Sequence, residues 1–266
     1  MWEESPKGQI KQGKEERTMG QGILARALVG LGILVWGTAP AGAGEPTVPD
    51  LNSRIEAYQE ERQAEGDEEL SEADRRTMRR SMEAIRRELP DPGLEGGERA
   101  PEFTLPNAFG EPVRLGEYLR QGPVILTFYR GAWCPYCNLE LHALKESLPA
   151  FRKHGAHVLA VSPQEPGHSL KQVKEEGFPF EVLSDLDNEV MRAYDLFFRV
   201  PEGMVEVYQR NYGLDLADYN GDGRYVLPVP GTFVIDQEGV VRAAFARVDY
   251  KQRMEPAAIL EALRGL

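Results

Sequence analysis

Apolar positions in the second half of the chain alternate between the pattern of buried strands and the pattern of helices. Residues 124–129 are almost continuously apolar, with β-branched and aromatic side chains, which is typical of a strand buried on both faces. From Leu141 to Phe151 apolar side chains recur every three or four residues, which predicts a helix. A second strand is expected over residues 156–161. Together these elements form a right-handed βαβ unit, and ligand sites in such sheets lie at the carboxyl ends of the strands.

Shorter patterns predict the other elements of this part of the chain. Residues 103–115 indicate a short hairpin, and residues 197–228 are an insertion before the late strand. Ser162-Pro163-Gln164 ends the second strand and is either part of a site at that edge or a plain loop. Further helices are expected over residues 167–176, 187–195 and 255–264, and further strands over residues 180–184, 232–236 and 240–248.

Residues 45–97 are interpreted as a helical extension with a linker. Ser71-x-x-Asp74 is typical of a capped helix start. A stripe that contains methionine at helical spacing is most often a packing surface. We expect the extension to lie on the following domain, residues 98–266, or to mediate contacts in a homodimer. The stripe consists of Met78, Met82, Ile85 and Leu89.

Residues 19–43 have the composition of a secretory signal peptide. Arg26 is followed by an apolar stretch and then by the small residues Ala41-Gly42-Ala43. Residues 1–18 are polar and charged, so that translation from Met19 is a hypothesis. The apolar stretch is short for a membrane span, and the alternative is an uncleaved N-terminal anchor. In either case the following domain is expected to be exported, to the periplasm if the source is bacterial.

Charge excludes some classes of partner. The chain of 266 residues has 31 basic and 43 acidic side chains and a net charge of −12, which argues against nucleic acid and against an anionic membrane surface. Hydrophobic residues make up 41% of the chain, enough for a sizeable core. Its two cysteines lie in one Cys-x-x-Cys, which points to redox or metal chemistry and cannot form a stabilising disulfide framework.

The two cysteines, Cys134 and Cys137, lie where the buried strand is followed by the helix. Cys134 is expected near the N-cap and Pro135 in the first turn, where its missing N–H costs nothing. Unpaired N–H groups and the helix dipole favour a thiolate there, and Arg130 adds a nearby cation. We expect Cys134 to be the more exposed of the two thiols and to have the lower pKa.

Two groups of polar residues resemble metal sites in part. A structural zinc ion needs about four ligands, and the chain offers one cysteine pair and four histidines. Asp218-x-Asn220-x-Asp222-Gly223 resembles the start of an EF-hand loop, but Val229 stands where a bidentate Glu belongs. A polar turn is the preferred reading, and no metal or other cofactor is expected. The histidines are His142, His154, His157 and His168.

Three segments resemble the peroxiredoxin-like (alkyl hydroperoxide reductase/thiol-specific antioxidant) family of the thioredoxin-fold superfamily. They are residues 130–137, which contain Cys-Pro-Tyr-Cys, residues 100–106 and residues 230–236. The resemblance covers about residues 98–266. It implies an α/β, thioredoxin-like fold with a central mixed sheet flanked by helices, here preceded by the helical extension. It also implies a site built from catalytic Cys134 and Cys137 with Arg130, Trp133, Pro135, Tyr136 and Pro230 around them.

Two alignments compete within this resemblance. Thioredoxins use the first cysteine of the pair as nucleophile, which is Cys134, whereas the peroxiredoxin pattern assigns the peroxidatic role to Cys137. Peroxiredoxins place an arginine where this chain has Pro230, and thioredoxins place a buried aspartate where it has Thr127.

The leading hypothesis is a thiol peroxidase that reduces hydrogen peroxide and organic hydroperoxides and is recycled by a thioredoxin-like donor. The alternatives are a thiol:disulfide oxidoreductase of exported proteins and a redox-sensing module.

Overall fold

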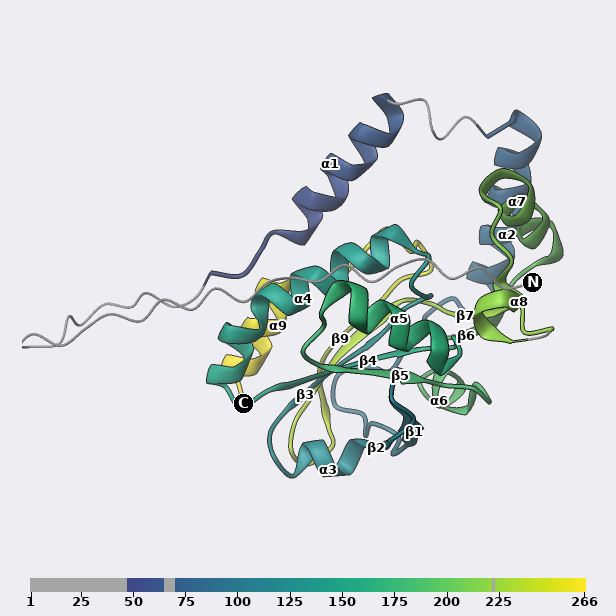
Figure 1. Ribbon diagram of the computed structural model, residues 1–266. Helices are drawn as coiled ribbons and strands as arrows, with labels where there is room; N and C mark the ends of the chain where they lie inside the picture. Colours follow the sequence, from purple (N-terminus) through teal and green to yellow (C-terminus); the bar gives the residue numbers. More distant parts are fainter. Residues whose placement is uncertain (1–46, 65–69, 222) are drawn as a thin grey trace, which may run out of the picture. The chain divides into compact units, whose positions relative to one another are not determined.

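The computed structural model describes residues 47–64, 70–221 and 223–266 (Figure 1). The expected signal peptide, residues 19–43, and the preceding residues 1–18 lie outside this part. Within it, no helix has the length and apolar character needed to cross a membrane.

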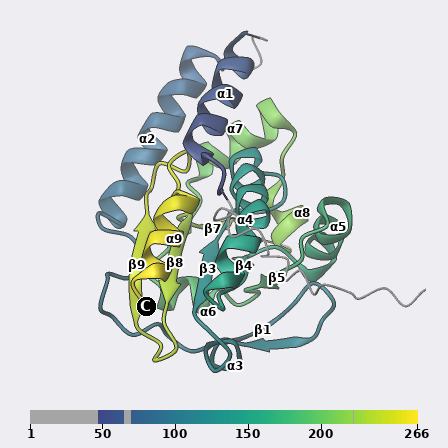
Figure 2. The ribbon, with the colours of Figure 1, turned by 90° about the vertical axis from the view of Figure 1, so that its left-hand side faces the viewer.

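Five strands form the central sheet, as the sequence predicts. They are β3 (Val124–Phe128), β4 (His157–Ser162), β5 (Glu181–Ser184), β8 (Gly231–Ile235) and β9 (Val241–Ala246), in the spatial order β5-β4-β3-β8-β9. β3 pairs parallel with β4, and β4 with β5, whereas β8 runs antiparallel to both β3 and β9. The sheet is therefore mixed, and β9 forms its outer edge beside the last helix (Figure 2).

Helices cover both faces of this sheet. α4 (Pro135–Lys153) and α9 (Pro256–Arg264) lie side by side on one face, and α5 (Pro166–Glu176) packs on the same face (Figure 1). α3 (Leu115–Leu119) and α6 (Glu189–Ala193) lie on the other face. Side chains of a strand alternate between the two faces, so that each layer of helices receives its own set of core residues.

The alternation is clearest along β3. Ile125 belongs to the core under α4 and α9, whereas Leu126 and Phe128 belong to the core of the opposite face. All five residues of this strand are fully buried, which explains the unbroken apolar stretch. The predicted hairpin is also present, because β1 (Thr104–Pro106) pairs antiparallel with β2 (Pro112–Arg114).

In the described part of the chain, two helices precede the β1–β2 hairpin. α1 (Leu51–Ala64) packs on α4, and its first turn is held by Glu255, whose carboxylate accepts the N–H of Leu51 at 3.0 Å. α2 (Glu72–Glu88) begins at the predicted cap, where Ser71 Oγ accepts the N–H of Asp74 at 3.1 Å. The methionine-containing stripe of α2 packs into the core, as expected.

The insertion forms a small subdomain that the sequence did not predict in detail. β6 (Phe197–Arg199) pairs antiparallel with β7 (Val226–Pro228), and between them lie α7 (Glu202–Tyr212) and α8 (Leu216–Asn220). Asp218 and Asn220, which the sequence places in a polar turn, belong to helix α8 instead. α7 packs along α2 of the extension (Figure 1).

Candidate active site

The Cys-x-x-Cys lies at the carboxyl end of β3, where the sequence places it. Cys134 is the N-cap of α4, and Pro135 is the first helical residue. The backbone carbonyl of Cys134 accepts the N–H groups of Cys137 and Asn138, both at 3.1 Å. The start of the helix therefore fixes both cysteines relative to each other, and both are free thiols.

Both thiols are fully buried, so the expectation that Cys134 is the more exposed was wrong. Each cysteine has 0% of its surface exposed. Aromatic side chains from other segments pack around the motif. Their ring centroids are separated by 5.4 Å for Tyr58 and Tyr136, and by 5.5 Å for Tyr136 and Tyr250. Burial by distant segments cannot be inferred from the position of a residue at a helix N-cap.

Arg130 is the cation nearest to Cys134. Its Nη1 donates to Cys134 Sγ at 3.7 Å, and the residue is only 5% exposed. The guanidinium lies 4.7 Å from the ring centroid of Trp133 and 4.2 Å from that of Tyr250. The structure thus brings together Arg130, Trp133 and Cys134, as the resemblance implies.

A second buried cation, Arg253, is not among the site residues expected from the sequence. It lies between β9 and α9, and its Nη2 donates to Cys137 Sγ at 3.4 Å. Its Nε lies 2.8 Å from Glu140 Oε2 in an ion pair whose angle falls outside hydrogen-bond geometry. The other carboxylate oxygen of Glu140 accepts hydrogen bonds from Thr232 at 3.0 Å and from Thr127 at 3.4 Å.

These two residues supply charges that the family patterns place elsewhere. Arg253 provides a cation beside a thiol, although the position that peroxiredoxins give to arginine holds Pro230. Glu140 provides a buried carboxylate against Thr127, where thioredoxins have the acid itself. Glu140 had a sequence signal, because it follows Cys137 by three residues on the buried face of α4. No local signal identifies Arg253.

The surroundings move the two thiol pKa values in opposite directions. Burial raises the pKa of Cys134, but the hydrogen bond with Cys137 and the charges of Arg130 and Arg253 outweigh it and hold this pKa well below its usual value. Burial, the hydrogen bond with Cys134 and its negative charge raise the pKa of Cys137. The geometry therefore favours a thiolate at Cys134 and a neutral thiol at Cys137.

Gln164 belongs to the site rather than to a plain loop. Its Oε1 accepts the N–H of Ala132 at 3.0 Å, and its Nε2 donates to Tyr129 Oη at 3.0 Å. Asn138 Nδ2 in turn donates to the carbonyl of Ala132 at 2.8 Å. The carboxyl end of β4 thus holds the loop that presents the thiols.

The remaining predicted site residues have different surroundings. Pro135 is exposed, and Tyr136 is buried with no hydrogen-bond partner for its hydroxyl among the described residues. Pro230 is buried directly before β8. Because Gly231 pairs with Phe128, the register places Pro230 beside the segment that leads into the motif.

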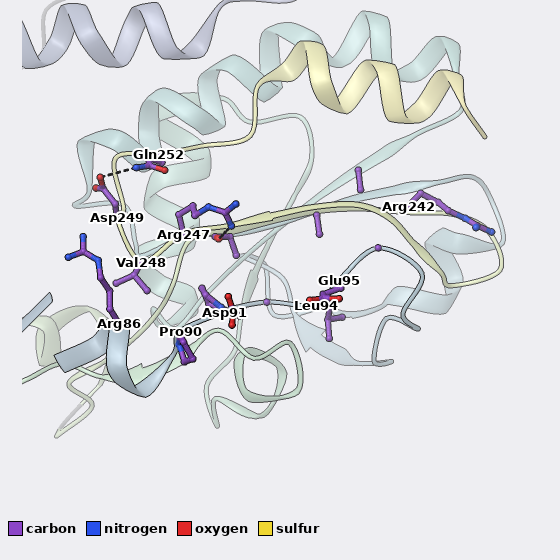
Figure 3. Close-up of a pocket in the computed structure, with 16 residues that line it drawn as sticks. Arg86, Pro90, Asp91, Leu94, Glu95, Arg242, Arg247, Val248, Asp249 and Gln252 are labelled. Carbon is purple, nitrogen blue, oxygen red and sulfur yellow. Dashed lines mark hydrogen bonds between the residues drawn. The ribbon is translucent and has the colours of Figure 1, made fainter. Parts of the chain in front are cut away.

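A cavity of about 820 Å³ lies apart from the thiols (Figure 3). It runs between the linker after α2 and the outer strand β9, and neither cysteine lines it. Gln252, which precedes Arg253, is at one end. This cavity is therefore not the entrance to the thiols.

Comparison with known proteins assigns the family. The AhpC/TSA family matches residues 96–244. A thiol-disulfide oxidoreductase ResA of Geobacillus kaustophilus is 29% identical over 160 residues, which cover 60% of this chain and 74% of that protein. A putative peroxiredoxin of Mycobacterium tuberculosis is 32% identical over 152 residues, which cover 57% of this chain and 84% of that protein.

Solved structures agree on the fold. The crystal structure of peroxidoxin BcpB from Mycobacterium tuberculosis has a TM-score of 0.51 and 23% identity, covering 65% of this chain and 98% of that one. A mutant of peroxiredoxin 6 from Arenicola marina also has a TM-score of 0.51, with 14% identity and coverage of 65% and 73%. The predicted thioredoxin-like fold is confirmed. The chain belongs to the AhpC/TSA family and is an oxidoreductase of the peroxiredoxin type.

Proposed function

We propose that the protein is a thiol peroxidase that reduces hydrogen peroxide and organic hydroperoxides through a Cys134–Cys137 dithiol/disulfide cycle. The observation that carries the proposal is the state of Cys134. Its pKa is lowered, a guanidinium lies 3.7 Å from its sulfur, and none of its surface is exposed. A small oxidant reaches such a thiolate after a small opening of the aromatic cover, whereas a protein disulfide needs a much larger one.

The first half of the cycle is an attack on the peroxide. The Cys134 thiolate attacks the terminal oxygen, the O–O bond breaks, and the sulfur becomes a sulfenic acid. The other oxygen leaves as an alkoxide or hydroxide and takes up a proton, giving an alcohol or water. Arg130 lies where it can stabilise negative charge on both the thiolate and the departing oxygen.

The second half forms the disulfide. The negative charge of Cys134 raises the pKa of Cys137 in the reduced protein, and this charge disappears when the neutral sulfenic acid forms. Cys137 then loses its proton more easily and attacks the Cys134 sulfur, and water leaves. Glu140 lies on the same face of α4 as Cys137 and, with a pKa that burial raises, is suited to accept that proton.

Recycling and location complete the proposal. A thioredoxin-like donor reduces the disulfide through a mixed disulfide and restores both thiols; this step needs the aromatic cover to open further in the oxidised protein than peroxide entry does in the reduced one. The composition of residues 19–43 supports export, to the periplasm if the source is bacterial, with an uncleaved N-terminal anchor as the alternative. A homodimer is compatible with the helical extension.

A second function is favoured by a separate observation. The ResA relative is a thiol-disulfide oxidoreductase by name, and a low-pKa cysteine that begins a helix suits that chemistry equally well. In that case Cys134 would attack disulfides of exported proteins, and Cys137 would resolve the mixed disulfide.

The test compares two activities of the full chain. Turnover of hydrogen peroxide and cumene hydroperoxide is followed with reduced thioredoxin as donor, and reduction of insulin is measured in parallel. Cys134→Ser and Cys137→Ser are the matched controls. We expect peroxide turnover that both substitutions abolish, with little insulin reduction. Insulin reduction without peroxide turnover would replace the peroxidase by the oxidoreductase.

A further inference from the structure

The insertion, residues 197–228, contacts the active site through Tyr208 of α7. α7 is held against α2 of the extension, where Asp74 forms an ion pair with Arg210 and accepts a hydrogen bond from Asn211 at 3.4 Å. The buried residues of α7 include Tyr208, which is 5% exposed. The contacts with α2 therefore hold the helix that presents Tyr208 to the thiol site.

Tyr208 contacts Arg130 in two ways. Its hydroxyl accepts a hydrogen bond from Arg130 Nη2, and its ring centroid lies 5.7 Å from the guanidinium carbon. Burial raises the pKa of Tyr208, and Arg130 opposes this shift only in part. Tyr208 is thus a neutral acceptor at physiological pH, and it orients the cation without neutralising it.

Arg130 depends on its contact with Tyr208, because it has few other polar partners. Among the described residues, no carboxylate lies within ion-pair distance of its guanidinium. A buried cation without a partner is strongly unfavourable. The available compensation is the Tyr208 hydroxyl, the rings of Trp133 and Tyr250, and the sulfur of Cys134. A long side chain has many rotamers, so the contact with Tyr208 selects the one that faces the sulfur.

We propose that Tyr208 is a positioning residue, through which the insertion holds the Arg130 guanidinium against Cys134 and thereby favours the thiolate. The proposal deepens the proposed peroxidase function, since it explains how the attacking thiol is kept ionised. It also gives residues 197–228 a role in the reaction. The described charged and titratable groups that face Cys134 are Arg130, Arg253, Cys137, Tyr208 and Tyr250.

The test measures the ionisation of Cys134 itself in the full chain. The rate of iodoacetamide alkylation at Cys134, resolved by mass spectrometry of the peptide, is followed as a function of pH. The midpoint of this pH dependence reports the ionisation of Cys134. Tyr208→Phe keeps the ring and removes the hydrogen-bond acceptor of Arg130, and we expect this midpoint to rise by about one pH unit. Tyr212→Phe, on the same helix but 48% exposed, is the matched control and should leave the midpoint unchanged.

A double-mutant cycle separates positioning from general structural damage. If Tyr208 acts through Arg130, adding Tyr208→Phe to Arg130→Met produces no further shift of the midpoint. An unchanged midpoint in Tyr208→Phe, or an equal shift with and without Arg130, overturns the proposal. A purely structural role would lower the melting temperature and leave the midpoint in place. Because alkylation needs no peroxide, a wild-type protein without peroxide turnover would refute the peroxidase function while this measurement still decides the role of Tyr208.

Discussion

Replacing Arg253 by methionine is predicted to destabilise the protein in a pH-dependent way. Methionine fills a similar volume but leaves the Glu140 carboxylate, 2% exposed, without its cation. Removal of one partner from a buried ion pair typically costs about 3–5 kcal/mol. The hydroxyl groups of Thr232 and Thr127 still donate to Glu140. We therefore expect the loss of unfolding free energy at neutral pH to lie near the lower end of this range.

The pH dependence follows from the direction of the Glu140 shift. Burial raises its pKa, and the Arg253 charge is the strongest opposing cause, so the substitution raises this pKa further. A carboxyl group whose folded pKa lies above its unfolded value contributes stability at low pH, and that contribution is lost as the pH rises through the folded pKa. Each pH unit in this window changes the free energy of unfolding by up to about 1.4 kcal/mol.

The assay is urea unfolding of the reduced protein at about pH 5 and about pH 8. Arg253→Met should lose more stability relative to wild type at the higher pH. The double substitution Arg253→Met/Glu140→Gln removes the unpaired carboxylate and keeps an acceptor for the threonines. It should therefore recover most of the loss and remove the part of the pH dependence that comes from Glu140, while the loss of the Arg253 charge near Cys134 is common to both variants. The reasoning is refuted if the double variant is no more stable than Arg253→Met at about pH 8, or if the loss is the same at both pH values.

Three further predictions concern the motif and its support. Peroxide treatment should join Cys134 and Cys137, seen by mass spectrometry as a loss of two hydrogens from one peptide; sulfinic acid on one cysteine with the other free would contradict it. Cys137→Ser should trap a sulfenic acid at Cys134, because the lower pKa belongs to that thiol; trapping in Cys134→Ser alone would make Cys137 the nucleophile. Gln164→Leu removes the acceptor of the partly buried N–H of Ala132 and should lower the free energy of unfolding by about 1 kcal/mol; an unchanged urea midpoint would contradict this.

Much of the fold could be predicted because its signals are local. The strand β3 is apolar along its whole length since both faces are covered, and α4 shows its period in the same segment. The helices and strands of the insertion have weaker sequence signals. β6 and β7 have three residues each, too few for an alternating pattern, while Gly203 and Gly213 limit the helical signal of α7 to a short stretch. The spacing of Met204, Val207 and Tyr208 is a local signal of that helix.

The site was predictable only as far as it is local. The helix N-cap, Pro135 and Arg130 lie within five residues of Cys134, and the structure places them as expected. The exposure of Cys134 could not be inferred, because its cover comes from α1, from α7 and from the segment after β9. Arg253 is 116 residues away from Cys137 in sequence, and its position depends on the length of β9 and on how the chain turns into α9.

The contrast between Pro230 and Arg253 shows what a comparison by sequence position can establish. Without an arginine at the position of Pro230, the chain lacks the cation that the peroxiredoxin pattern places there to favour a thiolate. Electrostatic stabilisation depends on the distance and burial of a charge, and not on the strand that carries it. Arg253 supplies a guanidinium from another segment at 3.4 Å from Cys137 Sγ, and Arg130 supplies a second one at 3.7 Å from Cys134 Sγ. A missing family residue therefore argues against a chemistry only when no other buried segment can deliver the same charge to the reacting atom.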